Sequence, residues 1–207
     1  MAQADGVVAT SDEVLRRLEL PRELPNLVLP NGVDVQHFAQ PDVARERIAI
    51  YVGAIDDRLD VEAFDVLADA FPTWSFQIFG PGSGSLRRGP GNVSWRGAAD
   101  YDQLPGLLAT ARIGLLPLSS APTNAGRSPM KLYEYLASGL SVLSSATPSI
   151  GENVDAQLLT YSDRDEMVRK FDVLARGPLV NESGRREAKT HGWGSKALQL
   201  ISFAEGI

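Results

Sequence analysis

The chain contains no cysteine and only two histidines among its 207 residues. Without cysteine it cannot form disulfide bonds, thiol nucleophiles or thiolate metal sites, and two histidines cannot make a zinc site unless carboxylates complete it. We therefore expect no metal centre. The sequence also lacks any run of about eighteen apolar residues and any charged-then-apolar leader, so we expect no transmembrane segment and a cytoplasmic location.

Positive charge is scarce as well. The 26 acidic residues outnumber the 20 lysines and arginines, which gives a formal net charge of −6. A surface of this sign repels the phosphates of DNA and RNA, so we expect no nucleic-acid partner in spite of the basic pairs at 87–88 and 185–186. With 43% hydrophobic and 22% charged residues, the chain can bury one sizeable core with a small appendage.

Short apolar runs alternate with segments of helical period, which is typical of an α/β protein with a doubly wound parallel sheet. The predicted strands are 6–10, 27–29, 48–53, 75–79, 93–95, 113–118, 142–144 and 158–161. Helices are predicted between them at 61–71, 101–111 and 166–175. The tail from residue 182 to 207 predicts one or two helices that break around Gly192.

Residues 128–139 read S-P-M-K-L-Y-E-Y-L-A-S-G and predict a helix with a start suited to an anion. Ser128 is expected as the N-cap, and Gly139 is expected to end the helix. Free N–H groups and the helix dipole favour a negative ligand at that start, where Lys131 shares a face with Glu134. The alternative is an ordinary surface helix in which these two side chains pair, a contact worth only ~0.2–0.5 kcal/mol.

Several segments, taken together, resemble the retaining GT-B glycosyltransferases of the family 4, or group 1, type. Residues 129–143 are similar to that family's P-x-K-x-x-E-Y-x-A-x-G-x-P-V-V pattern. Its A-D-x-V-x-x-x-S strand, its P-N-G-V-D hinge and the runs that follow have similar counterparts: ADGVVATS at 4–11, LPNGVD at 29–34, YVGAIDDRLD at 51–60, NVSWRG at 92–97 and GLLPL at 114–118. The resemblance covers nearly the whole chain and implies one Rossmann-like GT-B lobe.

A shift in composition at residues 38–47, where turn-forming and polar residues precede an apolar run, marks the predicted domain boundary. The resemblance implies that residues 1–40 are a remnant of the N-terminal, acceptor-binding lobe together with the hinge. Residues 41–207 are then the donor-binding Rossmann-like domain with its C-terminal helices. A separate chain would supply the rest of the N-terminal lobe, or apolar surface around residues 7–8 and 27–28 would promote a homo-oligomer.

The resemblance also implies a site for a nucleoside-diphosphate sugar of the UDP, GDP or TDP type, and no cofactor besides this substrate. Glu134 would hold the ribose hydroxyls, and Lys131 and Arg58 would face the diphosphate, so these three are the candidate catalytic residues. The other candidate binding residues follow strand ends or open the helix: Gly53, Gly80, Arg96, Gly97, Ser128 and Met130. The alternatives are that Arg58 pairs with a neighbouring aspartate, that 80–85 is a surface turn and that Arg96 is solvated.

One departure from the family concerns its E-x7-E pattern. Gly126 stands where many members have the first glutamate, so the usual contact to the transferred sugar is missing, and Asn124 and Arg127 are candidates to take over contacts in that loop. The reaction implied is metal-independent transfer of a sugar, with retention at the anomeric carbon. The acceptor would be a saccharide or a lipid-linked molecule in polysaccharide or glycoconjugate biosynthesis, in the cytoplasm or at the inner face of the membrane. The alternative is a non-catalytic nucleotide-binding half, or a partner-binding fragment, that needs a separate N-terminal lobe.

Overall fold

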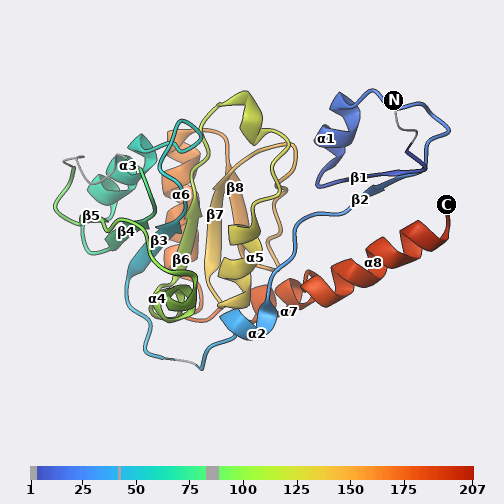
Figure 1. The fold of residues 1–207 in the computed structure, drawn as a ribbon. Coiled ribbons are helices and arrows are strands. Elements are labelled where there is room, and N and C mark those ends of the chain that lie inside the picture. Colours follow the sequence, from blue (N-terminus) through green and yellow to red (C-terminus); the bar gives the residue numbers. More distant parts are fainter. Residues whose placement is uncertain (1–3, 42, 83–88) are drawn as a thin grey trace.

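The fold was analysed in a computed structural model that describes residues 4–41, 43–82 and 89–207 (Figure 1). The basic pair 87–88 and residues 83–85 of the predicted turn lie outside the described residues. Within the described ranges, no helix combines the length and the apolar character that crossing a membrane requires.

A parallel sheet of six strands forms the centre of the main lobe, in the order β5-β4-β3-β6-β7-β8. Its strands are β3 (Ile48–Val52), β4 (Ser75–Phe79), β5 (Val93–Trp95), β6 (Ile113–Leu116), β7 (Ser141–Ser145) and β8 (Leu158–Tyr161). Chain order reverses between β3 and β6. Doubly wound sheets bind their ligands outside the carboxyl ends of the strands at such a reversal.

Helices cover both faces of this sheet, as the alternating pattern predicts (Figure 1). One face packs against α3 (Glu62–Ala70) and α6 (Arg164–Ala175) around a core that includes Phe64 and Phe171. The other face packs against α2 (Val35–Phe38), α4 (Leu104–Thr110), α5 (Met130–Ala137) and α7 (Glu182–Thr190). The sheet lies between the two apolar cores, which cover its faces but not the carboxyl ends of its strands.

Helix α5 lies close to β6 because Gly114 has no side chain. A Cβ at Gly114 would be only 2.3 Å from Cδ2 of Tyr135. Tyr135 is fully buried, and its hydroxyl accepts a hydrogen bond from the backbone N–H of Val52 at 2.9 Å. This contact holds α5 beside the end of β3.

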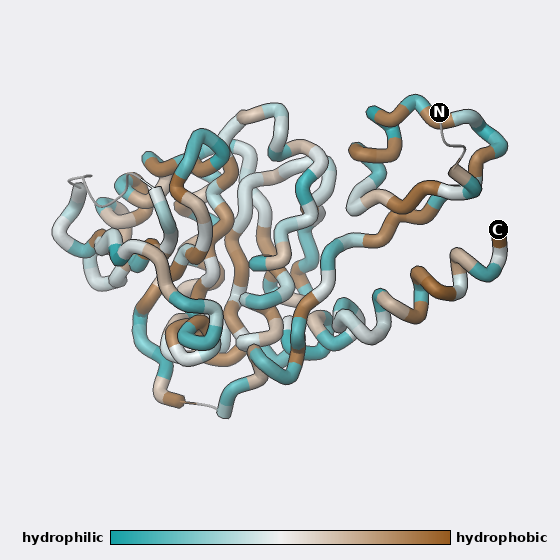
Figure 2. Tube along the Cα trace, in the orientation of Figure 1, coloured by the Kyte–Doolittle hydropathy of each residue, from teal (hydrophilic) through white to brown (hydrophobic). Residues whose placement is uncertain are grey.

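A smaller unit lies apart from the main sheet (Figure 1). It consists of β1 (Val7–Ala9), α1 (Asp12–Arg17) and β2 (Asn26–Val28), with the two strands paired in parallel. Helix α8 (Trp193–Glu205) runs from the main lobe towards this unit, where a Cβ at Gly6 would be 3.1 Å from the ring of Phe203. Hydrophobic residues occur along β1, β2 and α8 as well as through the main sheet (Figure 2).

The segment that links the small unit to the main lobe already packs against the main lobe from Val33 onwards. Val33 forms a parallel bridge with Gly192, and Phe38 of α2 is fully buried in one of the two main cores. The predicted division into residues 1–40 and 41–207 stays a prediction.

All eight predicted strands are present, with ends within two residues of those predicted, and the tail breaks before Trp193 into α7 and α8. The predicted doubly wound α/β class is therefore confirmed. The predicted N-cap of α5 is wrong. The helix begins at Met130 with Pro129 as its N-cap and without a side-chain cap, so Ser128 is not the N-cap. The hydroxyl of Ser128 instead accepts a hydrogen bond from the backbone N–H of Asn31 in the hinge, at 3.0 Å.

Candidate functional site

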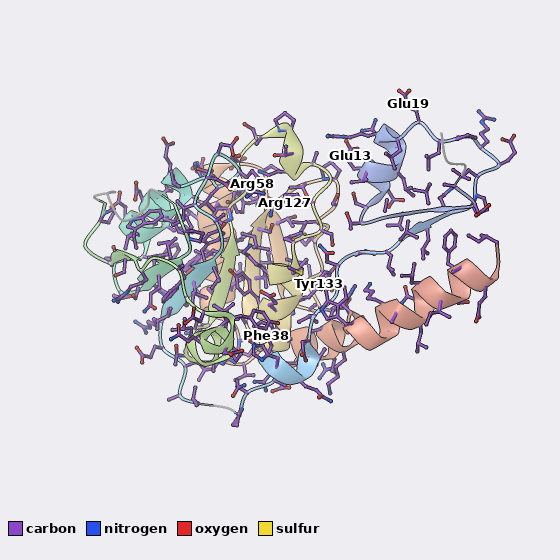
Figure 3. All side chains as sticks on the ribbon, in the orientation of Figure 1. Glu13, Glu19, Phe38, Arg58, Arg127 and Tyr133 are labelled. Carbon is purple, nitrogen blue, oxygen red and sulfur yellow. The ribbon has the colours of Figure 1, made fainter. Side chains whose placement is uncertain are left out.

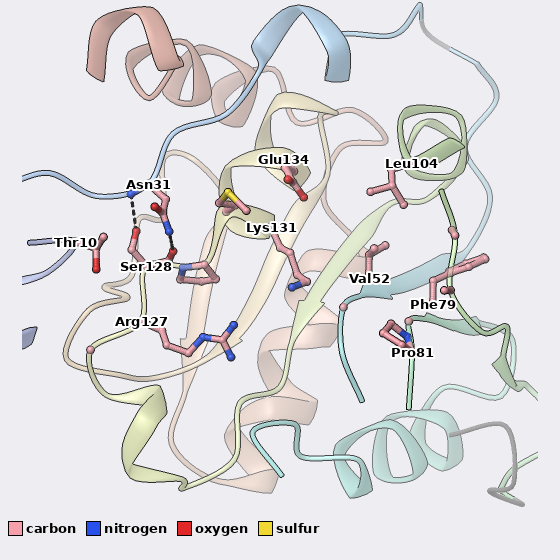
Figure 4. A pocket seen from close by; sticks show the side chains of 17 residues that line it. Thr10, Asn31, Val52, Phe79, Pro81, Leu104, Arg127, Ser128, Lys131 and Glu134 are labelled. Atoms are coloured by element: carbon pink, nitrogen blue, oxygen red, sulfur yellow. Dashed lines mark hydrogen bonds between the residues drawn. The ribbon is translucent and has the colours of Figure 1, made fainter. Parts of the chain in front are cut away.

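A cavity of about 540 Å³ opens at the carboxyl ends of β3 and β4, next to the start of α5 (Figure 4). Apolar side chains line one side of it, namely Val52, Phe79, Pro81 and Leu104. Polar and charged side chains line the other: Arg127, Ser128, Lys131 and Glu134 from the β6–α5 connection and α5, with Thr10 and Asn31 from the N-terminal part. The cavity lies at the reversal of strand order and thus where a doubly wound sheet binds ligands.

Two of the predicted glycines, Gly53 and Gly80, line this cavity, and Gly97 lies behind them without lining it. Gly53 donates its N–H to the carbonyl of Phe79 at 2.8 Å, and Gly80 donates to the carbonyl of Gly97 at 2.7 Å. A Cβ at Gly80 would be 1.7 Å from the carbonyl oxygen of Gly53, which no side chain can tolerate. Glycine at 80 therefore lets two strand ends approach each other, and Gly53 and Gly80 both line the cavity.

Gly53 also makes room for Lys131. A Cβ at Gly53 would be 2.3 Å from Cε and 2.6 Å from Nζ of Lys131. The lysine side chain therefore lies directly over the end of β3, held there because α5 packs against β6. Both residues are predicted site residues, and the fold brings them into contact.

Lys131 and Glu134 are both largely withdrawn from water. Burial lowers the pKa of Lys131, and the positive charge of Arg127 lowers that pKa further, while Glu134 raises it. Burial raises the pKa of Glu134, against the opposing effects of Lys131 and His37. Among the described residues neither side chain has an ion-pair partner within 4.0 Å, so the two do not form the surface pair considered as the alternative. Each can therefore contact a ligand.

Ser128 and Met130 flank the start of α5 and line the cavity. Ser128 accepts two hydrogen bonds from Asn31, one at its hydroxyl and one at its carbonyl oxygen, at 3.0 and 2.5 Å. The N–H of Leu132 donates to the carbonyl of Pro129 at 3.1 Å, and among the described residues no side chain caps the N–H groups of Met130 and Lys131 before it. A negative group is favoured at this position.

Arg58 and Arg96 do not line the cavity. The Arg58 guanidinium forms an ion pair with Asp56, with Nε at 3.0 and 3.1 Å from the two carboxylate oxygens. The hydrogen bond and the charge of Asp56 raise the pKa of Arg58. Arg96 is exposed, and its backbone N–H donates to the carbonyl of Ile78 at 2.8 Å. The roles proposed for these two side chains stay predictions.

The candidate residues missed or left open are Thr10, Asn31, Arg127, Ala98 and Ala99, all of which line the cavity. Asn124 is different. It is buried, and its amide donates to the carbonyls of Arg58 at 2.9 Å and Ser119 at 3.0 Å, so it ties the loop together. The described residues contain no group of three or more histidine, aspartate or glutamate side chains that could hold a metal ion.

Solved glycosyltransferases share this fold. Anabaena Alr3699/HepE in complex with UDP and glucose has a TM-score of 0.77 at 16% identity, over 99% of this chain and 64% of that one. Sucrose-phosphate synthase from Thermosynechococcus elongatus has a TM-score of 0.72 at 19% identity, over 99% of this chain and 58% of that one. These likenesses confirm the predicted Rossmann-like lobe of the GT-B fold.

The sequence has relatives as well. A curated protein of Bacillus subtilis (strain 168), named as the teichuronic acid biosynthesis glycosyltransferase TuaH, is 28% identical over 230 residues, which cover 97% of this chain and 57% of the relative. The chain therefore spans less than two thirds of the length of the relatives it matches. Residues 59–200 match the family described as "Glycosyl transferase-like", and the chain belongs to that family.

Proposed function

We propose that the chain binds a nucleoside-diphosphate sugar in this cavity and is the donor-binding part of a retaining glycosyltransferase. The observation that carries the proposal is the position of Lys131. It lies at the uncapped start of α5, over the carboxyl end of β3, in the cavity at the reversal of strand order. A cation, free N–H groups and the helix dipole at one point favour a phosphate ligand.

The cavity fits the parts of such a donor. A volume of about 540 Å³ is within the range of roughly 300–1,000 Å³ that small-molecule sites occupy. The side formed by Phe79, Pro81 and Leu104 is apolar, as a nucleobase requires, and Lys131 lies towards the polar side, where the diphosphate would be bound. Glu134, one helical turn further along α5, offers two carboxylate oxygens that can accept hydrogen bonds from ribose hydroxyls.

In the reaction that we propose, the bond from the anomeric carbon to the diphosphate oxygen breaks and negative charge develops on the leaving diphosphate. Lys131 and the start of α5 stabilise this charge by electrostatics, in a site withdrawn from water where such interactions are strong. A hydroxyl oxygen of a saccharide or lipid-linked acceptor forms the new bond to the anomeric carbon with retention, and its proton passes to the leaving diphosphate. The transfer needs no metal ion and no covalent protein intermediate. The name of the Bacillus subtilis relative supports a role in polysaccharide biosynthesis.

A second candidate is a nucleotide-binding part that becomes active only with a further lobe, or with a second copy of the chain. The β1–β2 sheet favours it. Among the described residues, no third strand pairs with either of its two parallel strands of three residues each, and a sheet this small is not stable by itself. Slow hydrolysis of a nucleotide sugar by the purified chain would favour the enzyme, whereas binding without any turnover would favour this second candidate.

The test is calorimetric titration of the purified chain with UDP, GDP and TDP. We expect saturable binding of at least one of them, weakened tenfold or more by Lys131→Ala and by Glu134→Ala, which corresponds to ~1.4 kcal/mol or more. Lys170→Ala is the matched control, because Lys170 lies on α6, pairs with Glu152 and Glu166, and does not line the cavity. Absence of nucleotide binding in a folded chain, or equal effects of the Lys131 and Lys170 substitutions, would refute the proposal.

A further inference from the structure

A second cation, Arg127, shares the cavity with Lys131. It lies in the connection from β6 to α5, and its side chain points into the cavity towards Lys131 (Figure 4). Among the described residues its guanidinium makes no ion pair and no hydrogen bond within the distance limits. A planar group with five donors is therefore available to a ligand.

The charge of Arg127 acts on Lys131. After burial, the charge of Arg127 is the largest influence that lowers the pKa of Lys131, and it exceeds the opposing effect of Glu134 on the same side chain. Two like charges in a site withdrawn from water repel each other. An anion between them turns that repulsion into two attractions, so the arrangement favours a ligand with at least two negative charges.

Arg58, the residue predicted for the same purpose, is already paired. Its guanidinium binds both carboxylate oxygens of Asp56, and neither residue lines the cavity. Both arginines lie at the same end of the sheet (Figure 3), and the charge of Arg127 reaches Asp56, whose pKa it lowers after the larger effects of Arg58. Arg58 would have to break its ion pair with Asp56 to bind a ligand, whereas the guanidinium of Arg127 has no such partner among the described residues.

The backbone on either side of Arg127 is held by the N-terminal part of the chain. The hydroxyl of Ser11 donates to the carbonyl of Gly126 at 2.9 Å, and Asn31 donates twice to Ser128. The N–H of Arg127 itself donates to the carbonyl of Asn124 at 3.2 Å. These contacts keep the loop at the cavity and aim the guanidinium.

We infer that Arg127 and Lys131 form a two-cation clamp for the diphosphate of the donor, and that Arg127 takes the part expected of Arg58. This inference rests on the proposed function. It goes further because it names Arg127, and not Arg58, as the second cation that binds the diphosphate beside Lys131. Arg127 would bind the diphosphate directly and stabilise it as the leaving group.

The experiment is titration of the wild-type chain and four variants with inorganic pyrophosphate, and with the nucleoside diphosphate that the chain binds best. Arg127→Ala should weaken both ligands at least tenfold, and Arg127→Lys should restore part of the loss because it keeps the charge. Arg58→Ala and the control Arg176→Ala, an exposed residue of the α6 C-terminus, should change either affinity less than about threefold. Circular dichroism of each variant reports whether the fold is kept.

Each outcome decides a different claim. A larger loss for Arg58→Ala than for Arg127→Ala would overturn the clamp and leave the proposed function standing. Binding of pyrophosphate that depends on Arg127, without binding of any nucleoside diphosphate, would refute the proposed function and leave the clamp. A folded wild-type chain that binds neither ligand would refute both.

Substitution of Ser11 supplies a second, independent test. Ser11 holds the loop through the carbonyl of Gly126 and does not line the cavity. Ser11→Ala should weaken pyrophosphate binding in the wild-type background and have no further effect in the Arg127→Ala background. A purely structural role for Ser11 would instead lower thermal stability equally in both backgrounds and leave the affinity of each unchanged, which would overturn the claim that this contact aims Arg127.

Discussion

Substitution of Gly53 by alanine places a methyl group where the end of Lys131 lies. The new Cβ would be 2.3 Å from Cε and 2.6 Å from Nζ of Lys131, and 2.8 Å from the hydroxyl of Tyr51. Since carbon atoms in contact are about 3.5–4.0 Å apart, the lysine must move by more than about 1 Å. Its side chain is flexible, so we expect the fold to survive, with a loss of roughly 1–3 kcal/mol of stability from overpacking and from the strain of alanine at the positive φ of Gly53, 156°.

The consequence for binding follows from the displaced ammonium group. A hydrogen bond to a charged group contributes about 1.5–3 kcal/mol, so its loss should weaken nucleoside-diphosphate binding roughly 10- to 150-fold. The assay is calorimetric titration of wild type, Gly53→Ala, Lys131→Ala and the double variant. Because both single changes remove the same contact, the double variant should bind about as weakly as Lys131→Ala alone.

Gly91→Ala is the matched control for the glycine substitution, because Gly91 is exposed and a Cβ there would have no neighbour within 4 Å. It should leave affinity unchanged. Additive losses in the Gly53→Ala, Lys131→Ala double variant would refute the reasoning, since they would mean that Gly53 acts on binding by a route other than Lys131. Unchanged affinity in Gly53→Ala would refute it as well.

Three further predictions concern stability. Gly80→Ala should destabilise the fold by roughly 3 kcal/mol or more in urea unfolding, because its Cβ would lie 1.7 Å from the rigid carbonyl oxygen of Gly53, not from a flexible side chain. Asn181→Ala should cost about 2–4 kcal/mol in the same assay, since its buried side chain caps α7 and donates to two carbonyls at 3.0 and 2.7 Å. Burial raises the pKa of Glu134 above its usual 4.5, so the folded state holds that proton more tightly than the unfolded state, and wild-type stability should fall relative to Glu134→Gln as the pH rises from about 4.5. An unchanged difference between these two proteins from pH 4 to 7 would contradict the last prediction.

Local sequence was sufficient for the elements that need only their own residues. The strands follow from apolar runs, and the end of α5 follows from Gly139, which has a positive φ of 77° after the helix. Gly53, Gly80 and Lys131 could be proposed as site residues because each follows a strand or opens a helix at the expected edge of the sheet. In a parallel sheet all strands end at the same edge, so residues that directly follow a strand can be placed at that edge from the sequence.

Partners far along the chain could not be predicted in the same way. Ser128 has the residue type of an N-cap, but it bonds to Asn31, which is 97 residues away. Asp60 precedes α3 and has the residue type of an N-cap, but no side chain caps this helix, and the carboxylate of Asp60 pairs with Arg164 at 2.7 Å, 104 residues away. In both cases the side chain can bond either to the nearby helix end or to a distant partner. A local capping preference of about 1 kcal/mol is too small to determine which of the two it takes.

The same limitation applies to the two arginines and explains what the N-terminal part contributes. Arg58 was the stronger candidate by resemblance, but an adjacent aspartate occupies its guanidinium. Arg127 was a candidate only because its loop departs from the E-x7-E pattern, and its place in the cavity depends on a loop fixed by Ser11 and Asn31. The polar end of the cavity is therefore assembled from two regions, α5 of the main lobe and the small β1–α1–β2 unit with its hinge. A change in how that unit lies on the main lobe would move Arg127 while Lys131 stays in place. Donor affinity should thus depend on the N-terminal unit, even though most of the cavity wall belongs to the main lobe.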